Sequence, residues 1–160
     1  MTRGITADDG KTTTKVIHRT TNIVNAEVAF FSKTKHKADT YMNYTRPPLA
    51  IGLEPIKKAF LDAKNRGIYM RYITEINKDN LTYCRELMQI VHELRHLDGI
   101  KGNFMVSEGE YIAPLILFEH GKIAPQAFYS NAEQVVEHQQ YIFENLWEKQ
   151  YLQKKGLERL

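Results

Sequence analysis

Apolar side chains recur with the spacing of an α-helix in four segments of the chain. A threonine pair at positions 20 and 21 precedes the first segment, as expected of a helix start. Pro55 suits the first turn of the second helix, and Gly67 suits its end. The predicted helices run from Thr20 through Phe31, from Glu54 to Arg66, from Asn77 or Asp79 to Glu93, and from Ser130 or Asn131 through Trp147.

Between these segments apolar positions alternate with a period of two, which is typical of strands. Two prolines after Arg46 are expected to interrupt regular structure there. Because helices and strands alternate along the chain, we expect an α/β three-layer sandwich with a mixed sheet of about five to seven strands. The alternative is a ferredoxin-like α+β layer. The predicted strands are Ala38–Tyr44, Ile68–Thr74, Phe104–Ser107, Tyr111–Phe118 and Ala124–Tyr129.

The length of 160 residues suits one domain. Residues 1–19 hold few large apolar groups, so we expect a flexible lead-in with at most a short strand at Val16-Ile17. Residues 20–149 then form the α/β domain. Residues 150–160 continue the last helix as an extension toward a following module.

Composition and charge narrow the class of protein. The chain has 22 Lys and Arg against 19 Asp and Glu, a net charge of +3 that is too small and too dispersed for a nucleic-acid groove. We therefore expect no nucleic-acid partner. The single cysteine, Cys84, excludes an internal disulfide. No segment has the length and apolar character of a membrane span or a signal-peptide core, so we expect a cytoplasmic protein without a membrane partner.

His92, Glu93 and His96 match the H-E-x-x-H pattern of zinc-dependent hydrolases. On a helix both imidazoles would share a face and could bind one zinc, with Glu93 as general base. The motif falls at the end of its predicted helix, and Gly102 stands where the extended motif would place a third ligand. We therefore expect no metal and no cofactor, and keep a zinc-dependent hydrolase using His92 and His96 as the alternative function.

The segment KGNFMVSEGE, residues 101–110, resembles the catalytic strand of the phospholipase D superfamily, His-x-Lys-x-x-x-x-Asp followed by a glycine turn. Lys101 stands in place of the nucleophilic histidine, Asn103 in place of the lysine, and Glu108 in place of the aspartate. The resemblance implies a phospholipase-D-like fold. It argues against the activity, because cleavage in that family requires the imidazole nucleophile.

A second resemblance spans most of the chain, from Ile23 to Lys149. Residues 45–68, 71–91, 93–104 and 129–147 together resemble the N-terminal input domain of archaeal sensor histidine kinases. That resemblance implies a signal-input role without catalysis, and a final helix that leads to the next module. We therefore expect a non-catalytic domain of a two-component sensor, which binds a small ligand or a protein partner and forms a homodimer.

Polar residues predicted at the carboxyl ends of strands and at crossovers supply a candidate ligand site, because open α/β sheets bind ligands at this edge. Basic side chains beside a helix N-terminus favour an anion such as a carboxylate or phosphate. We assign no catalytic residue. The candidates are Arg71, Thr74, Glu75, Arg95, Asp98, Lys101, Asn103 and Ser130.

Overall fold

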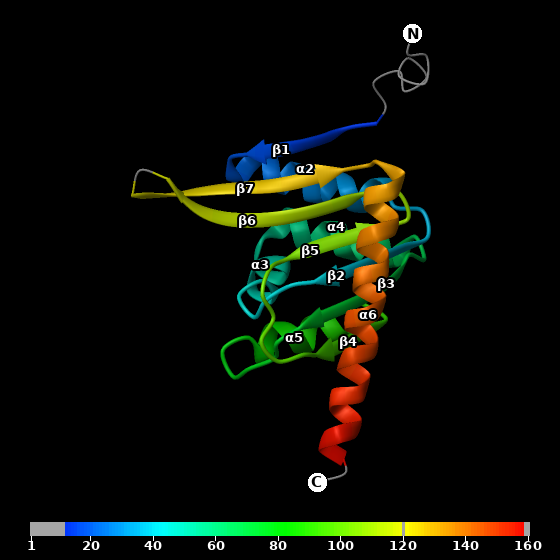
Figure 1. Cartoon of the computed structure of the whole chain (residues 1–160). Coiled ribbons are helices and arrows are strands. Elements are labelled where there is room, and N and C mark those ends of the chain that lie inside the picture. Colours follow the sequence, from blue (N-terminus) through cyan, green and yellow to red (C-terminus); the bar gives the residue numbers. More distant parts are fainter. Residues whose placement is uncertain (1–11, 120, 159–160) are drawn as a thin grey trace.

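The computed structural model describes residues 12–119 and 121–158, and its centre is a mixed sheet (Figure 1). In this part of the chain seven strands lie in the order β1-β7-β6-β5-β2-β3-β4. Strand β3 runs parallel to β2 and β4, and all other neighbours are antiparallel. The strands are β1 (Thr14–His18), β2 (Lys37–Tyr41), β3 (Tyr69–Thr74), β4 (Glu93–His96), β5 (Phe104–Ser107), β6 (Tyr111–Glu119) and β7 (Lys122–Ser130).

Helices cover both faces of this sheet, which confirms the predicted α/β sandwich and excludes the ferredoxin-like alternative with helices on one face. Helix α6 crosses one face, and α2 to α5 lie on the other (Figure 1). None of the helices described is long and apolar enough to cross a membrane. The helices are α2 (Thr20–Lys33), α3 (Pro47–Gly52), α4 (Glu54–Asn65), α5 (Leu81–Met88) and α6 (Glu133–Glu158).

Side chains of β2 and β3 alternate between two apolar clusters. Met70 and Tyr72 pack with Phe31 and Phe60 beneath α2 and α4. Ile73 belongs instead to the cluster beneath α6 that contains Phe143 and Trp147. Because successive strand residues point to opposite faces, the two parallel strands form the floor of both layers.

Three local predictions are corrected by the structure. The helix expected to reach Glu93 ends at Met88, and Glu93–His96 forms β4, paired in parallel with β3. The prolines after Arg46 begin a short helix, α3, because the first helical positions need no backbone N–H. Thr14–His18, expected in the lead-in, is a strand paired with β7. Residues 1–11 lie outside the described residues.

Candidate functional site at the junction of the sheet and helix α6

The phospholipase-D-like strand segment holds structural contacts at two of its three replaced positions. The Asn103 side-chain oxygen accepts the Asn43 backbone N–H at 2.9 Å and so connects the start of β5 to the loop after β2. Lys101 is exposed.

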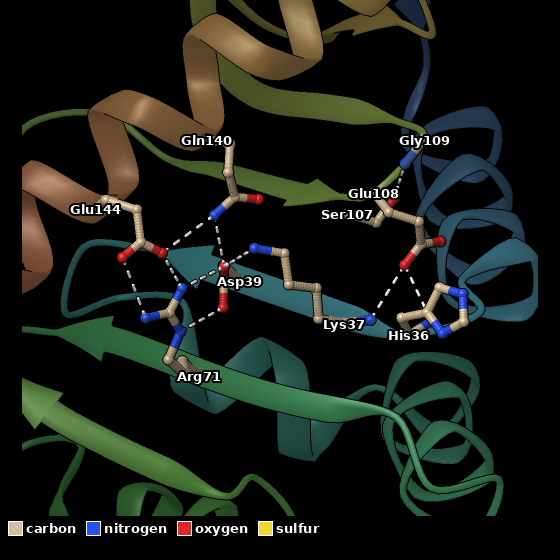
Figure 2. Close-up of polar contacts among 9 residues, drawn as sticks. All are labelled: His36, Lys37, Asp39, Arg71, Ser107, Glu108, Gly109, Gln140 and Glu144. Atoms are coloured by element: carbon tan, nitrogen blue, oxygen red, sulfur yellow. Dashed lines mark hydrogen bonds and ion pairs between the residues drawn. The ribbon is translucent and has the colours of Figure 1, made fainter.

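Glu108 is the third of these positions, and Figure 2 shows its carboxylate beside the start of β2. Hydrogen bonds from backbone N–H groups lower its pKa and outweigh the opposing effect of desolvation. A carboxylate used in this way connects the β5–β6 turn to the α2–β2 loop. The three donors are the backbone N–H groups of Lys35, His36 and Lys37, at 2.9, 3.0 and 3.1 Å.

Several predicted ligand residues gather at the carboxyl ends of β3 and β4, as expected. Thr74 is buried and donates its hydroxyl to the Asn43 carbonyl at 3.3 Å. One Glu75 carboxylate oxygen accepts the Gly99 N–H at 3.2 Å. Asp98 lies 2.6 Å from the His96 Nε2 atom. These contacts hold the loops that follow β2, β3 and β4 together at that edge of the sheet.

Ser130 does not join this group. It lies on β7 and its hydroxyl is 2.7 Å from that of Thr14 on β1. Its oxygen also accepts the Ala132 N–H at 3.1 Å, before α6 begins. Ser130 therefore joins β1, β7 and α6, far along the sheet from Thr74.

His92 and His96 stand four residues apart in an extended segment, so about 13 Å of backbone separates them. The Nδ1 atom of His92 accepts the Met70 N–H at 3.1 Å, and that of His96 accepts the Ile76 N–H at 3.0 Å. Two ligand atoms of one zinc lie about 2 Å from the metal. The two rings cannot share a zinc in this fold, and the described residues hold no cluster of three or more metal-ligating side chains.

The strongest polar cluster lies under α6, where Arg71 of β3 meets an acidic residue from each side (Figure 2). Its Nε and one terminal nitrogen donate to the two Asp39 carboxylate oxygens, both at 2.8 Å. The same terminal nitrogen forms an ion pair with Glu144 of α6. Gln140, one turn earlier, donates to Asp39 at 2.8 Å. We name Asp39, Arg71, Gln140 and Glu144 the α6 anchor.

Burial makes the α6 anchor a strong junction. The Asp39 side chain is 0% exposed and that of Arg71 is 12% exposed. Desolvation alone would lower the Arg71 pKa, but hydrogen bonds to Asp39 and Glu144 raise it, so the guanidinium stays charged. The hydrogen bond from Arg71 likewise lowers the pKa of Glu144. The Gln140 Oε1 atom is buried and has no hydrogen-bond partner among the residues that the structure describes.

Aromatic rings extend this junction toward β4. The Arg71 guanidinium lies 5.0 Å from the ring centroids of both Phe143 and Trp147, which are stacked on each other. Arg95 lies 3.8 Å from the Trp147 centroid and pairs with Glu93. Cation–π contacts of this kind add to the ion pairs and fix the height of α6 over the sheet.

Sequence reasoning identified Arg71 and Arg95 but missed their partners on α6 and β2. Asp39 did carry a signal, since it is a charged residue inside an otherwise uncharged strand core. Its partner Arg71 is 32 residues away, and Glu144 is a further 73 residues along the chain. Only the parallel register that pairs position 39 with position 71 brings them together.

Comparisons with known proteins support the fold and nothing finer. No family model and no curated protein matches this chain. A phospholipase D family member, Nuc from Salmonella typhimurium, superposes with a TM-score of 0.68 at 12% identity, over 86% of this chain and 95% of that one. TrmBL2, an archaeal chromatin protein, superposes with a TM-score of 0.62 at 16% identity, over 85% of this chain.

The chain spans about half of TrmBL2, since the match covers 52% of that protein. The structure of TrmBL2 is described as showing a novel mode of DNA binding. This finding contradicts the prediction, made from the small net charge, that the chain has no nucleic-acid partner. A small net charge does not separate this fold from DNA-binding proteins. The chain has a phospholipase-D-like α/β fold.

Proposed function

We propose that this chain is a non-catalytic signal-input domain, with α6 as its output element. The observation that carries the proposal is the α6 anchor, in which Arg71 pairs with the buried Asp39 of β2 and with Glu144 of α6, whose side chain is 45% exposed. Asp39 and Arg71 both lie on the sheet and stay paired when α6 leaves, so the helix has an engaged arrangement, with Glu144 and Gln140 on the anchor, and a released one without these two contacts. An element with two discrete arrangements is what transmission between sites requires.

The absence of catalysis rests on the replaced strand positions. Asn103 and Glu108 bind backbone groups, so their polar atoms are engaged in holding loops. The sensor histidine kinase resemblance supplies the downstream partner in this proposal, a kinase module reached through α6 in a cytoplasmic two-component sensor. The strand-end residues Thr74, Glu75 and Asp98 remain the proposed contact for a ligand or protein partner at that edge, together with Lys101.

Trp147 makes the proposal testable, because it is the only tryptophan of the chain and lies against Arg71 and Arg95. A thermal-shift screen with small acids, sugars, phosphate and duplex DNA identifies a binder. DNA belongs in the panel because a chain with this fold binds it. We then expect saturation with the binder to change both Trp147 emission and amide hydrogen exchange in α6.

Arg71→Gln is the uncoupling variant, and Arg85→Gln, on the exposed face of α5, is its matched control. Arg71→Gln should keep binding and lose the Trp147 response, and the control should keep both. Saturation without any response in α6 would refute the output role. Hydrolysis of bis(4-nitrophenyl) phosphate that is lost in Lys101→Ala would refute the absence of catalysis.

We also propose that the domain self-associates, through α6 or through an exposed edge of the sheet. Strands β1 and β4 end the described sheet, and such edges carry unpaired backbone groups. Light scattering over a range of protein concentrations should show a dimer. A monomer at the highest concentration would contradict this.

A further inference from the structure

A cavity of about 370 Å³ opens on the face of the sheet opposite α6. Its walls come from α2, α3, the start of α4 and the β6–β7 hairpin, and its floor from β2 and β3. Most of the lining is apolar, with Phe31, Phe60, Met42 and Met105 in the interior. Leu49 at the rim is 41% exposed. This volume and lining are typical of small-molecule sites.

Two charged side chains, Glu27 of α2 and Arg46 before α3, line this cavity without hydrogen-bond or ion-pair partners in the described part of the chain. The other half-buried arginines of the described chain are engaged: Arg71 binds two carboxylates, and Arg95 pairs with Glu93. A partly buried guanidinium without an acceptor is costly. A ligand that carries an acceptor group would therefore satisfy Arg46.

The charge of the cavity favours an anion below neutral pH. Burial raises the pKa of Glu27 to about 7, although the nearby Arg46 acts in the opposite direction. Tyr72 on the floor is buried, and its pKa is raised mainly by desolvation, so it stays neutral. With Glu27 protonated, Arg46 is the one net charge among these groups.

We propose that this cavity binds a small amphipathic carboxylic acid, with its apolar tail among the phenylalanine and methionine side chains and its carboxylate on Arg46. A cationic head would be repelled by Arg46. A sugar would find too few polar partners, since the polar side chains of the lining besides the two charged ones are Tyr72 and two threonines. The inference goes beyond the proposed function, which places its ligand contact at the strand ends, and binding in the cavity does not itself need α6.

The cavity and the α6 anchor share the same two strands. Thr40 and Tyr72 line the cavity and are paired across β2 and β3. Their chain neighbours Asp39 and Arg71 are also paired and point to α6. A ligand that shifts the cavity floor therefore acts directly on the strands that hold the anchor.

Three probes that share the same tail and differ in head group test which head group the cavity binds. They are decanoate, 1-decanol and decyltrimethylammonium, each titrated calorimetrically at pH 6. We expect decanoate to bind most tightly and the cation most weakly. Arg46→Gln should weaken decanoate about tenfold or more, because a charge-assisted contact is lost. It should leave decanol nearly unchanged. Arg85→Gln is the matched control and should bind all three as the parent does.

Val24→Phe places bulk into the cavity from the half-buried face of α2 and should weaken decanoate and decanol alike. Circular dichroism confirms that each variant is folded. Equal affinity for the three probes, or decanoate binding unchanged by Arg46→Gln, would overturn the proposal. So would a dimer that Val24→Phe dissociates, which would make a second copy the occupant. Decanoate that binds as expected but leaves Trp147 unchanged would support the site and refute only the output role.

Discussion

Replacing Glu27 by glutamine should stabilise the protein at alkaline pH. Burial raises the pKa of this carboxyl from 4.5 to about 7, so the folded chain holds a proton that the unfolded chain has already released. Between these two pH values the folded state binds more protons, and stability falls as pH rises. One pKa unit is worth about 1.4 kcal/mol, which gives a cost of about 3 kcal/mol at pH 8. Glutamine does not ionise and avoids this cost.

Urea unfolding of the parent and of Glu27→Gln from pH 5 to pH 8 measures the difference. The two curves should nearly coincide at pH 5 and separate to about 2–3 kcal/mol at pH 8. Arg46 and Tyr72 face Glu27 in both proteins, so their contributions largely cancel in the difference. Glu137→Gln, at an exposed position on α6, is the control and should follow the parent. A difference that stays constant with pH would refute the assignment of Glu27 as a buried acid.

Other contacts give three further expectations. Arg71→Ala should lower the free energy of unfolding by about 3–5 kcal/mol in urea titrations, because it removes both guanidinium hydrogen bonds from the buried Asp39 and leaves Lys37, 3.9 Å away, as its nearest cation; a loss below about 1 kcal/mol would contradict this. Asn103→Ala should cost about 1–2 kcal/mol and Lys101→Ala less than about 0.5, and equal effects would contradict the contacts of this strand. The lowered pKa of Glu144 means that its contribution is present above about pH 4.5 and is lost as pH falls through the folded value. Trp147 emission should therefore change below pH 4.5 in the parent, and a change of the same size in Glu144→Gln would contradict this.

Much of the fold follows from the local pattern. The helices α2 and α4 and the strands β3, β5, β6 and β7 lie where periodicity predicts them. The pattern fails after Met88, because the helix predicted to reach Glu93 ends there and Glu93–His96 pairs with β3 instead. A short segment with mixed polarity has no strong preference of its own, so the open edge of β3 decides its conformation.

The functional sites were predictable only in part. Thr74, Glu75 and Asp98 converge as the rule for strand ends requires, but local hydrogen bonds already engage them. Ser130 was misplaced because strand order cannot be derived from spacing along one chain. The cavity left no local signal, since Glu27 resembles any polar residue on an amphipathic helix.

Our proposal gives the two faces of β2 and β3 different roles, ligand binding on one face and anchoring of α6 on the other. Asp39 and Arg71 neutralise each other on the α6 face, so the strands tolerate full burial there. One residue further along, Thr40 and Tyr72 place hydroxyl groups against an apolar cavity. A movement of either strand cannot alter one face alone, because alternate residues belong to one rigid backbone. In our proposal, this shared backbone is what links ligand binding in the cavity on one side to release of α6 on the other.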